Sequence, residues 1–249
     1  MRVGVYMDLT AMQFAAATAP GKPLRALFAG EGGVVSFVRV MADTPGGASR
    51  ISAGVFQDVT TLCTLMGVTC APVFWPRKTW KPERWAIARS LAALGTDDPV
   101  LDIEHQAKSQ KTRRALAQNS FEHFPYRSVI TTHAGHPEAD DPSWPNNPYE
   151  MQAYSTADMV RTVGPMALPG SWQVRQARRG CQPPGLALPV YDPEGLPEEP
   201  ADELRRALFA AWSVRMERVC YWSLKHILRN KYAIPFLRDD APRILGRCS

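Results

Sequence analysis

The chain has 249 residues, of which 45% are hydrophobic, and it carries a net charge of +5 at pH 7. This length and composition suit a single domain with a large core, and the mild basic charge is compatible with an anionic polymer such as a wall glycan or nucleic acid. The Lys and Arg residues are scattered apart from short clusters at 111–114 and 175–179, a distribution that favours solvated helix faces over a nucleic-acid surface.

The cysteines and the first residues bear on the compartment. Five widely spaced cysteines form no C-x-x-C pair, so we expect neither a zinc site nor a disulfide framework. Cys63 and Cys220 lie within apolar patterns and are expected in the core. The N-terminus reaches Asp8 too early for a signal-peptide core, and no run of 18 apolar residues occurs. We therefore expect synthesis in the cytoplasm, no secretion signal and no membrane span.

Apolar runs and helical spacings alternate along the chain. In chain order, the expected elements are strand 2–9, strand 33–41, helix 51–66, strand 68–75, helix 82–94, strand 99–105, helix 106–123, strand 126–133, strand 149–154, strand 185–192, helix 200–214, strand 218–223 and helix 224–237. Residues 164–184 are irregular and basic, and the tail at 238–249 is polar and expected to be peripheral.

Eight strands, most of them followed by helical sequence, predict an α/β fold, a single (β/α)8 barrel over residues 1–249. A doubly wound open sheet would show the same alternation. That fold would carry a Gly-rich phosphate turn after the first strand, and none follows residues 2–9. The barrel is therefore favoured.

The most informative stretch is Pro99 to His105, an apolar run that ends in two acids one residue apart. Side chains of a strand alternate between faces, so Asp102 and Glu104 point the same way, with Cα atoms roughly 6.5 Å apart. Acids at the end of a buried strand must be solvated, hydrogen-bonded or used. Paired carboxyls suit acid/base chemistry on a glycosidic bond. Alternatively, Asp102 caps the next helix and Glu104 is a solvated loop acid.

The barrel fold would gather further polar and aromatic side chains around these acids. The carboxyl ends of barrel strands form one rim, and the chemistry of such enzymes lies there. The expected strand ends carry Asp8, Arg39, Trp75, Asp102, Glu104, His133, Gln152, Tyr154, Tyr191, Asp192 and Trp222. This clustering favours a catalytic interpretation of Glu104.

Four short motifs resemble a known family. Asp8 on the first strand, Asp102-Ile103-Glu104 on the fourth, Gln152-Ala153-Tyr154-Ser155 and Tyr221-Trp222-Ser223 resemble the glycosidase-like barrels of bacteriophage lysins and wall-degrading proteins. These include the lysozyme-like family 25 glycoside hydrolases. The resemblance spans nearly the whole chain. It implies a muramidase-like hydrolase of peptidoglycan with no cofactor, in which Glu104 is the proton donor and Asp102 and Asp8 share its acidic cleft.

A second carboxylate, Asp8 or Asp192, would then assist water or stabilise the sugar cation. Trp75, Tyr154 and Trp222 could stack on sugar faces. Gln152, Tyr191 and Arg39 complete the expected substrate contacts. The sequence departs from family 25 at the eighth strand, where Trp222-Ser223 stands in place of a late aspartate.

Two other functions stay open. The first is a catalytically silent barrel that serves as a structural or carbohydrate-binding part of a larger assembly such as a phage particle, where phage structural proteins would be partners. The second is a metal-dependent hydrolase that uses Asp8, His105, His133 and His136. No H-x-H occurs on the first strand, which disfavours the metal site. Without an export signal, a wall hydrolase would depend on lysis or on incorporation into a virion.

Overall fold

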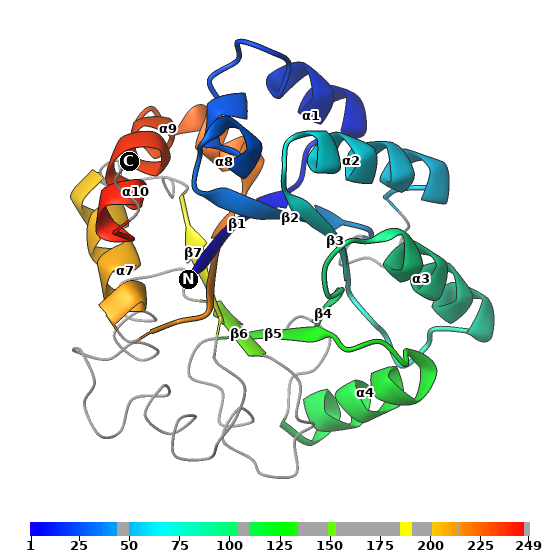
Figure 1. Cartoon of the computed structure of the whole chain (residues 1–249). Helices are drawn as coiled ribbons and strands as arrows, with labels where there is room; N and C mark the ends of the chain where they lie inside the picture. Colours follow the sequence, from blue (N-terminus) through cyan, green and yellow to red (C-terminus); the bar gives the residue numbers. More distant parts are fainter. Residues whose placement is uncertain are drawn as a thin grey trace.

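The described part of the chain is a closed barrel of eight parallel strands. The computed structural model describes residues 1–43, 50–103, 110–133, 149–152, 185–190, 201–213 and 215–246. The strands pair in sequence order and β8 closes on β1, with the helices outside (Figure 1). Both the α/β class and the (β/α)8 barrel predicted from the sequence are therefore confirmed.

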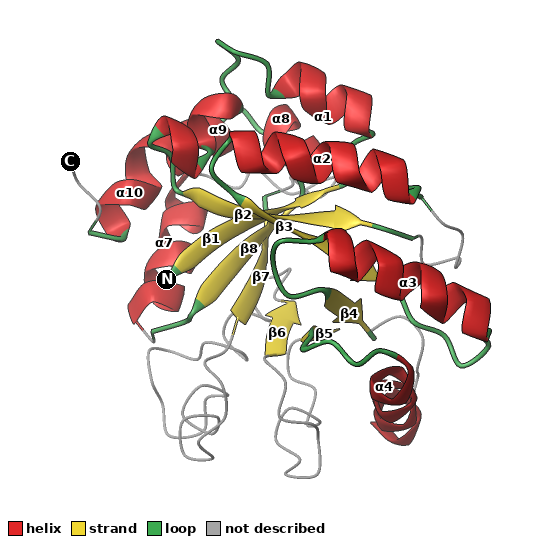
Figure 2. Cartoon of the chain, turned by 45° about the vertical axis from the view of Figure 1, so that its right-hand side comes forward, coloured by secondary structure: helices red, strands yellow, loops and turns green. Residues whose placement is uncertain are grey.

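Each strand lies inside one of the eight predicted runs. The strands are β1 Arg2–Met7, β2 Val35–Met41, β3 Thr69–Phe74, β4 Val100–Asp102, β5 Val129–His133, β6 Tyr149–Gln152, β7 Gly185–Pro189 and β8 Arg218–Trp222. The helices are α1 Ala11–Ala17, α2 Ala53–Leu65, α3 Pro82–Leu94, α4 Gln110–His123, α7 Ala201–Ser213, α8 Leu224–Arg229, α9 Ala233–Pro235 and α10 Ala241–Ile244. Figure 2 shows helices α1 to α4 packed outside the strands. No helix in the described ranges is long and apolar enough to span a bilayer.

Local sequence explains where the helices begin and end. Thr10 and Gln13 form a capping box at α1, and the Ser52 hydroxyl accepts a hydrogen bond from the amide of Val55 at α2. Pro82 occupies the first turn of α3, as the sequence predicts. Gly67 has a φ of 69° just after α2, a conformation that favours glycine.

The strand alternation separates two cores. Strand side chains that point out of the barrel pack against the helices, and Cys63 of α2 belongs to this outer core. Strand side chains that point into the barrel fill its lumen. They are Tyr6, Phe37, Met41, Val73, Trp75, Val100, Val129, Ala187 and Cys220, with Trp222 packed against them. Cys63 and Cys220 are both fully buried, which confirms their predicted place in the core.

The last helical region differs from the prediction. A single helix over 224–237 is broken because the Asn230 side chain donates to the carbonyl of Val190 and accepts from the amide of Tyr232. Beyond it, the chain continues through α9, a π-helical turn at Phe236–Asp240, and α10. Ala241 is fully buried, and Asp240 pairs with Arg205 at 2.8 Å. This part of the predicted peripheral tail therefore packs on the barrel, because its few apolar residues face the core.

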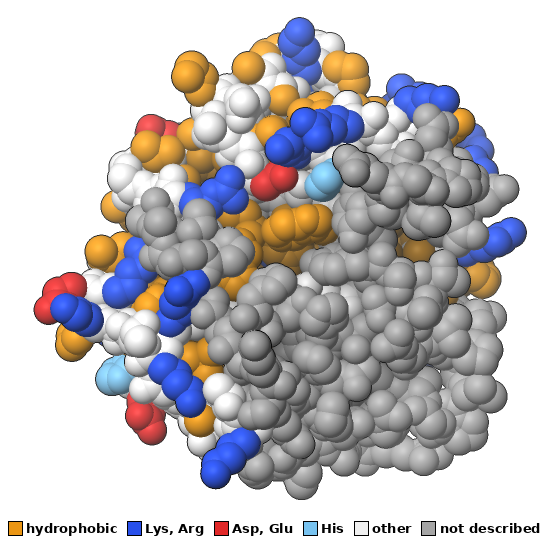
Figure 3. Space-filling view, turned by 180° about the vertical axis from the view of Figure 1, so that it is seen from behind, with side chains coloured by type: hydrophobic (Ala, Val, Ile, Leu, Met, Phe, Trp, Pro, Cys, Tyr) orange, Lys and Arg blue, Asp and Glu red, His pale blue; other side chains and the backbone are white. Residues whose placement is uncertain are grey.

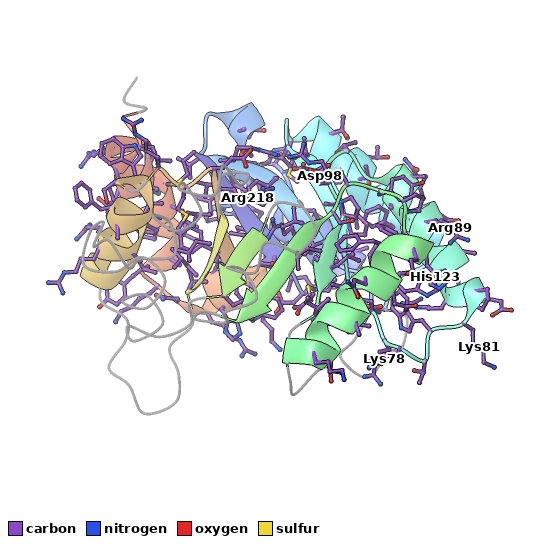
Figure 4. The ribbon with its side chains drawn as sticks, turned by 90° about the horizontal axis from the view of Figure 1, so that it is seen from below. Lys78, Lys81, Arg89, Asp98, His123 and Arg218 are labelled. Carbon is purple, nitrogen blue, oxygen red and sulfur yellow. The ribbon has the colours of Figure 1, made fainter. Side chains whose placement is uncertain are left out.

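The amino-terminal end of the lumen is closed by charged side chains. Arg2 pairs with Asp97 at 2.5 Å and donates to the Thr69 hydroxyl at 2.8 Å. Arg218 lies across Gly185, where an added Cβ would come within 2.7 Å of the arginine side chain. Asp98 and Arg218 lie at this end in Figure 4. Only about 10 Å³ of cavity remains here, no more than one water needs.

Gly4 provides a test of lumen packing. A Cβ at Gly4 would approach the Phe37 ring to 2.1 Å, so Gly4→Ala should lower the free energy of unfolding by about 2–3 kcal/mol through overpacking. Urea unfolding measures this loss, and adding Phe37→Leu should recover part of it.

The matched control is Gly54→Ala in α2, where no atom lies within 4 Å of the added Cβ. This change should raise stability by about 0.5–1 kcal/mol through helix propensity. Equal effects of the two substitutions would contradict the described lumen packing.

Candidate functional site

The open end of the lumen is the mouth formed by the carboxyl ends of the strands. Figure 1 looks at the end of the barrel where β1 begins, and Figure 3 shows the opposite face. On that face a hollow has a hydrophobic floor, with an acidic and a histidine side chain at its rim (Figure 3). The candidate site is therefore at the end where barrel enzymes carry their chemistry.

Asp102 is a buried acid of the mouth. It ends β4, is only 4% exposed, and its Oδ2 accepts a hydrogen bond from Gln152 Nε2 at 3.3 Å. Its register partners on β5 and β6 are Thr131 and Glu150, which are both fully buried. Two carboxyls thus lie at one level of the lumen on nearby strands.

A buried ion pair lies beneath the mouth. Arg39 of β2 donates to Glu150 of β6 across the lumen, and its guanidinium also donates to the Tyr6 hydroxyl at 3.0 Å. The Tyr6 hydroxyl in turn donates to Glu150 Oε1 at 2.9 Å. The Arg39 and Glu150 side chains are 3% and 0% exposed. We call these three residues the lumen network.

The lumen network has a definite charge state. Burial lowers the pKa of Arg39, but Glu150 and Tyr6 outweigh it, so the pKa is held well above its ordinary value. Burial and the negative charge of Glu150 raise the pKa of Tyr6 well above its ordinary value. Arg39 is therefore a cation and Tyr6 a neutral hydroxyl at every pH at which the chain would work.

Aromatic side chains cover the lumen network towards the mouth. The Tyr6 and Trp222 rings have centroids 4.9 Å apart at an interplanar angle of 56°. Trp222 is partly exposed, whereas Trp75 is 4% exposed. The peptide bond between Trp222 and Ser223 is cis. Trp222 is therefore the described lumen aromatic that offers a ring to a ligand.

Asp8 lies at the rim between β1 and β8, with both carboxyl oxygens engaged. Oδ2 accepts from the Ser223 hydroxyl at 2.6 Å, and Oδ1 accepts from the amide of Lys225 in the first turn of α8 at 3.0 Å. These bonds fix the β8–α8 turn at the mouth. Asp8 thus has a structural role in addition to any contact with a ligand.

Asp43 is an acid of the mouth that the sequence analysis did not single out. It is fully buried, accepts from the amide of Trp75 at 2.9 Å and pairs with Arg84 of α3 at 2.9 Å. Burial raises the pKa of Asp43 to about 6, because the hydrogen bonds from Trp75 and Arg84 only partly offset the loss of hydration.

The structure brings together some of the predicted site residues. Asp102, Gln152 and Trp222 lie at the mouth, Asp8 at its rim, Trp75 in the lumen, and Arg39 below them, paired with Glu150. The other predicted residues, Glu104, Tyr154, Tyr191 and Asp192, lie outside the described residues, as do His105 and His136. His133 belongs to β5. Within the described ranges, no three His, Cys, Asp or Glu residues gather as metal ligands.

Sequence reasoning missed Glu150 and Asp43. Side chains two residues apart on a strand point the same way. Glu150 lies two residues before Gln152, and Asp43 lies four residues after Arg39, with Met41 between them. The signal was present in the strand alternation. Asp43 lies beyond the expected strand 33–41, and Glu150 lies near the start of the expected strand 149–154, so neither residue falls at an expected strand end.

Comparisons with known proteins bear on the fold. No protein-family model matches the sequence, and no curated protein matches it. Among solved structures, the catalytic domain of a hyperthermophilic chitinase from Pyrococcus furiosus is similar, with a TM-score of 0.62 and 8% identity over 99% of this chain and 96% of that one.

Two further structures show how broad this likeness is. A family 128 endo-β-1,3-glucanase from Amycolatopsis mediterranei, in complex with laminaripentaose, has a TM-score of 0.53 and 16% identity over 96% of this chain and 98% of that one. A sugar phosphate isomerase/epimerase from Parabacteroides distasonis has a TM-score of 0.53 and 10% identity over 98% and 96%. The chain therefore has the barrel fold that glycoside hydrolases of polysaccharides share, and identities this low show the fold alone.

Asp43 predicts a pH-dependent stability. A carboxyl with a raised pKa in the folded chain binds its proton more tightly there than in the unfolded chain. Protonated Asp43 therefore stabilises the fold below about pH 4, and this stabilisation is lost as the pH rises to about 6. Relative to Asp43→Asn, the wild type should lose about 2 kcal/mol of unfolding free energy between these pH values. Urea unfolding at several pH values measures the difference.

Asp58→Asn, at an exposed acid of α2, is the control and should follow the wild-type pH curve. If the unfolding free energies of the wild type and Asp43→Asn change in parallel with pH, Asp43 titrates as an ordinary acid and the prediction is wrong.

Proposed function

We propose that this protein is a glycoside hydrolase that cleaves a polysaccharide in the mouth of its barrel. One observation carries the proposal: Asp102, only 4% exposed, ends β4 and is held by Gln152 Nε2 at the same end of the barrel at which β8 ends in the partly exposed Trp222. A buried acid oriented by an amide, with a partly exposed aromatic ring at the same end of the barrel, suits a sugar, since sugars offer both hydroxyls and an apolar face.

The proposed mechanism assigns the general acid to Glu104, two residues beyond Asp102. Glu104 would protonate the leaving oxygen, while the Asp102 carboxylate stabilises the positive charge that develops on the sugar ring. The second carboxylate would be Asp8 or Asp192. Asp8 would have to act while it holds Ser223 and Lys225, because both of its oxygens accept hydrogen bonds from them.

The proposed substrate is a cell-wall glycan, with peptidoglycan first among the candidates. This choice rests on the resemblance of the short sequence motifs to family 25 lysozyme-like enzymes. In this proposal Trp222 stacks on a sugar ring, with Tyr154, Tyr191 and Trp75 as further aromatic contacts and Gln152 as a polar one. Release by lysis or incorporation into a phage particle would bring the protein to the wall.

A carbohydrate-binding barrel without catalysis is the second candidate. The state of Asp8 favours it, because a carboxylate that fixes the β8–α8 turn with both oxygens is not free to activate water. In that function the mouth would still bind a glycan through Trp222 and Gln152. Activity is therefore the property that separates the two candidates.

The test is hydrolysis of a panel of purified peptidoglycan, chitin, mannan and β-1,3-glucan between pH 4 and 8. The wild type should release reducing sugar from one of them. Glu104→Gln and Asp102→Asn should each lower kcat/KM by about 10²–10⁴-fold, the usual contribution of a general acid or of charge stabilisation.

Asp98→Asn is the matched control, because Asp98 lies just before β4 at the closed end of the same barrel. It should retain wild-type activity. Binding of a glycan without hydrolysis would favour the silent barrel, and no binding to any member of the panel would refute the proposed function.

A further inference from the structure

We infer that the lumen network of Tyr6, Arg39 and Glu150 is a positioning device that holds Trp222 as the sugar platform of the mouth. The inference rests on the proposed function for the identity of the ligand, and on the geometry of the lumen for the positioning itself. None of the three residues needs to touch the ligand.

The first step is the position of the network. Arg39 comes from β2 and Glu150 from β6, so their contact spans the lumen. Barrel lumens are usually filled by branched apolar side chains. Here the lumen also holds the apolar cluster of which Val73 is a member, and a charged pair in such surroundings loses its hydration. Cys220 and Arg218 also interact with the pair.

The second step is the fixed orientation of Tyr6. Its hydroxyl oxygen accepts from Arg39 at 3.0 Å, and its hydrogen is donated to Glu150 at 2.9 Å. The Arg39 guanidinium carbon also lies 5.4 Å from the centroid of the Tyr6 ring. A phenol held by Arg39, which is both donor and cation, and by Glu150 as acceptor has one position, whereas a phenylalanine at residue 6 would lack both hydrogen bonds.

The third step links Tyr6 to the mouth. The Trp222 ring lies 4.9 Å from the Tyr6 ring, on the partly exposed side of the lumen. The backbone after Trp222 is held separately, because the next residue, Ser223, donates to Asp8. Tyr6 thus supports the indole ring from inside the lumen, and Asp8 holds the backbone next to Trp222 through Ser223. Together these contacts fix the face of the indole that is presented to a ligand.

The experiment observes Trp222 without any ligand. Protein labelled with 5-fluorotryptophan gives a ¹⁹F resonance for each of its seven tryptophans, and Trp222→Phe identifies the one from Trp222. Tyr6→Phe keeps the ring and removes only the hydroxyl. The double variant Arg39→Met with Glu150→Leu removes the ion pair without leaving an unpaired charge. Both should shift and broaden the Trp222 resonance.

Two controls separate positioning from a general loss of structure. Trp85 packs on Trp80 and Phe124 outside the lumen, so its resonance should stay in place in every variant. The double variant Arg25→Met with Glu31→Leu removes an ion pair outside the lumen and should leave Trp222 unchanged. If the double variant in the lumen does not fold, Tyr6→Phe alone decides the outcome.

A second measurement uses the glycan that the wild type cleaves or binds. Tyr6→Phe should raise KM or Kd by about tenfold and change kcat by less than about threefold, because it disturbs the platform and not the acids. An unchanged Trp222 resonance in Tyr6→Phe and the lumen double variant would overturn the inference. A wild type that binds no glycan, with Trp222 still responding to Tyr6→Phe, would refute the proposed function and leave the positioning role standing.

Discussion

The interaction on which the mouth depends is the ion pair between Arg39 and Glu150 in the centre of the barrel. Removing two charges from water is unfavourable, and the Tyr6 hydroxyl partly compensates for it by hydrogen bonding to both partners, although Oε2 of Glu150 is buried with no hydrogen-bond partner among the described residues. Arg39 also lies 5.2 Å from the Phe37 ring, whose bulk is accommodated by Gly4. Contacts between side chains therefore continue through the lumen from the closed end to the mouth. A substitution of one partner alone would leave a buried charge with no counterion.

This arrangement gives the two ends of the barrel different properties. At the closed end, Arg2 and Arg218 fill the space between the strands, with Asp97 as a counterion. At the mouth, Asp102 is held by Gln152 and Trp222 packs on Tyr6. A rigid interior that supports a few exposed functional groups is what a binding site for a semi-flexible polymer requires, because the ordering of the protein is complete before the ligand arrives.

Much of the fold could be predicted from the sequence, because apolar runs that alternate with segments of helical periodicity are typical of a (β/α)8 barrel. Pro82 and Gly67 mark the ends of helices through purely local chemistry. The break after α8 could not be predicted, because it depends on a contact between Asn230 and the distant Val190. For the candidate site, the sequence predicted that Asp102 and Gln152 lie near strand ends, and the structure has them at the ends of β4 and β6. The sequence could not reveal that Arg39 pairs with Glu150, since that pairing joins strands 111 residues apart.

We propose that the carboxyl end of the barrel binds a glycan at Trp222. A crystal structure of Glu104→Gln with a bound oligosaccharide of the best-recognised polysaccharide tests it most directly. The account predicts a sugar ring stacked on the Trp222 indole, with a hydroxyl within hydrogen-bond distance of Asp102 or Gln152, and with the Arg39 and Glu150 pair unchanged beneath it. An oligosaccharide bound elsewhere on the surface, with the mouth unoccupied, would contradict the account.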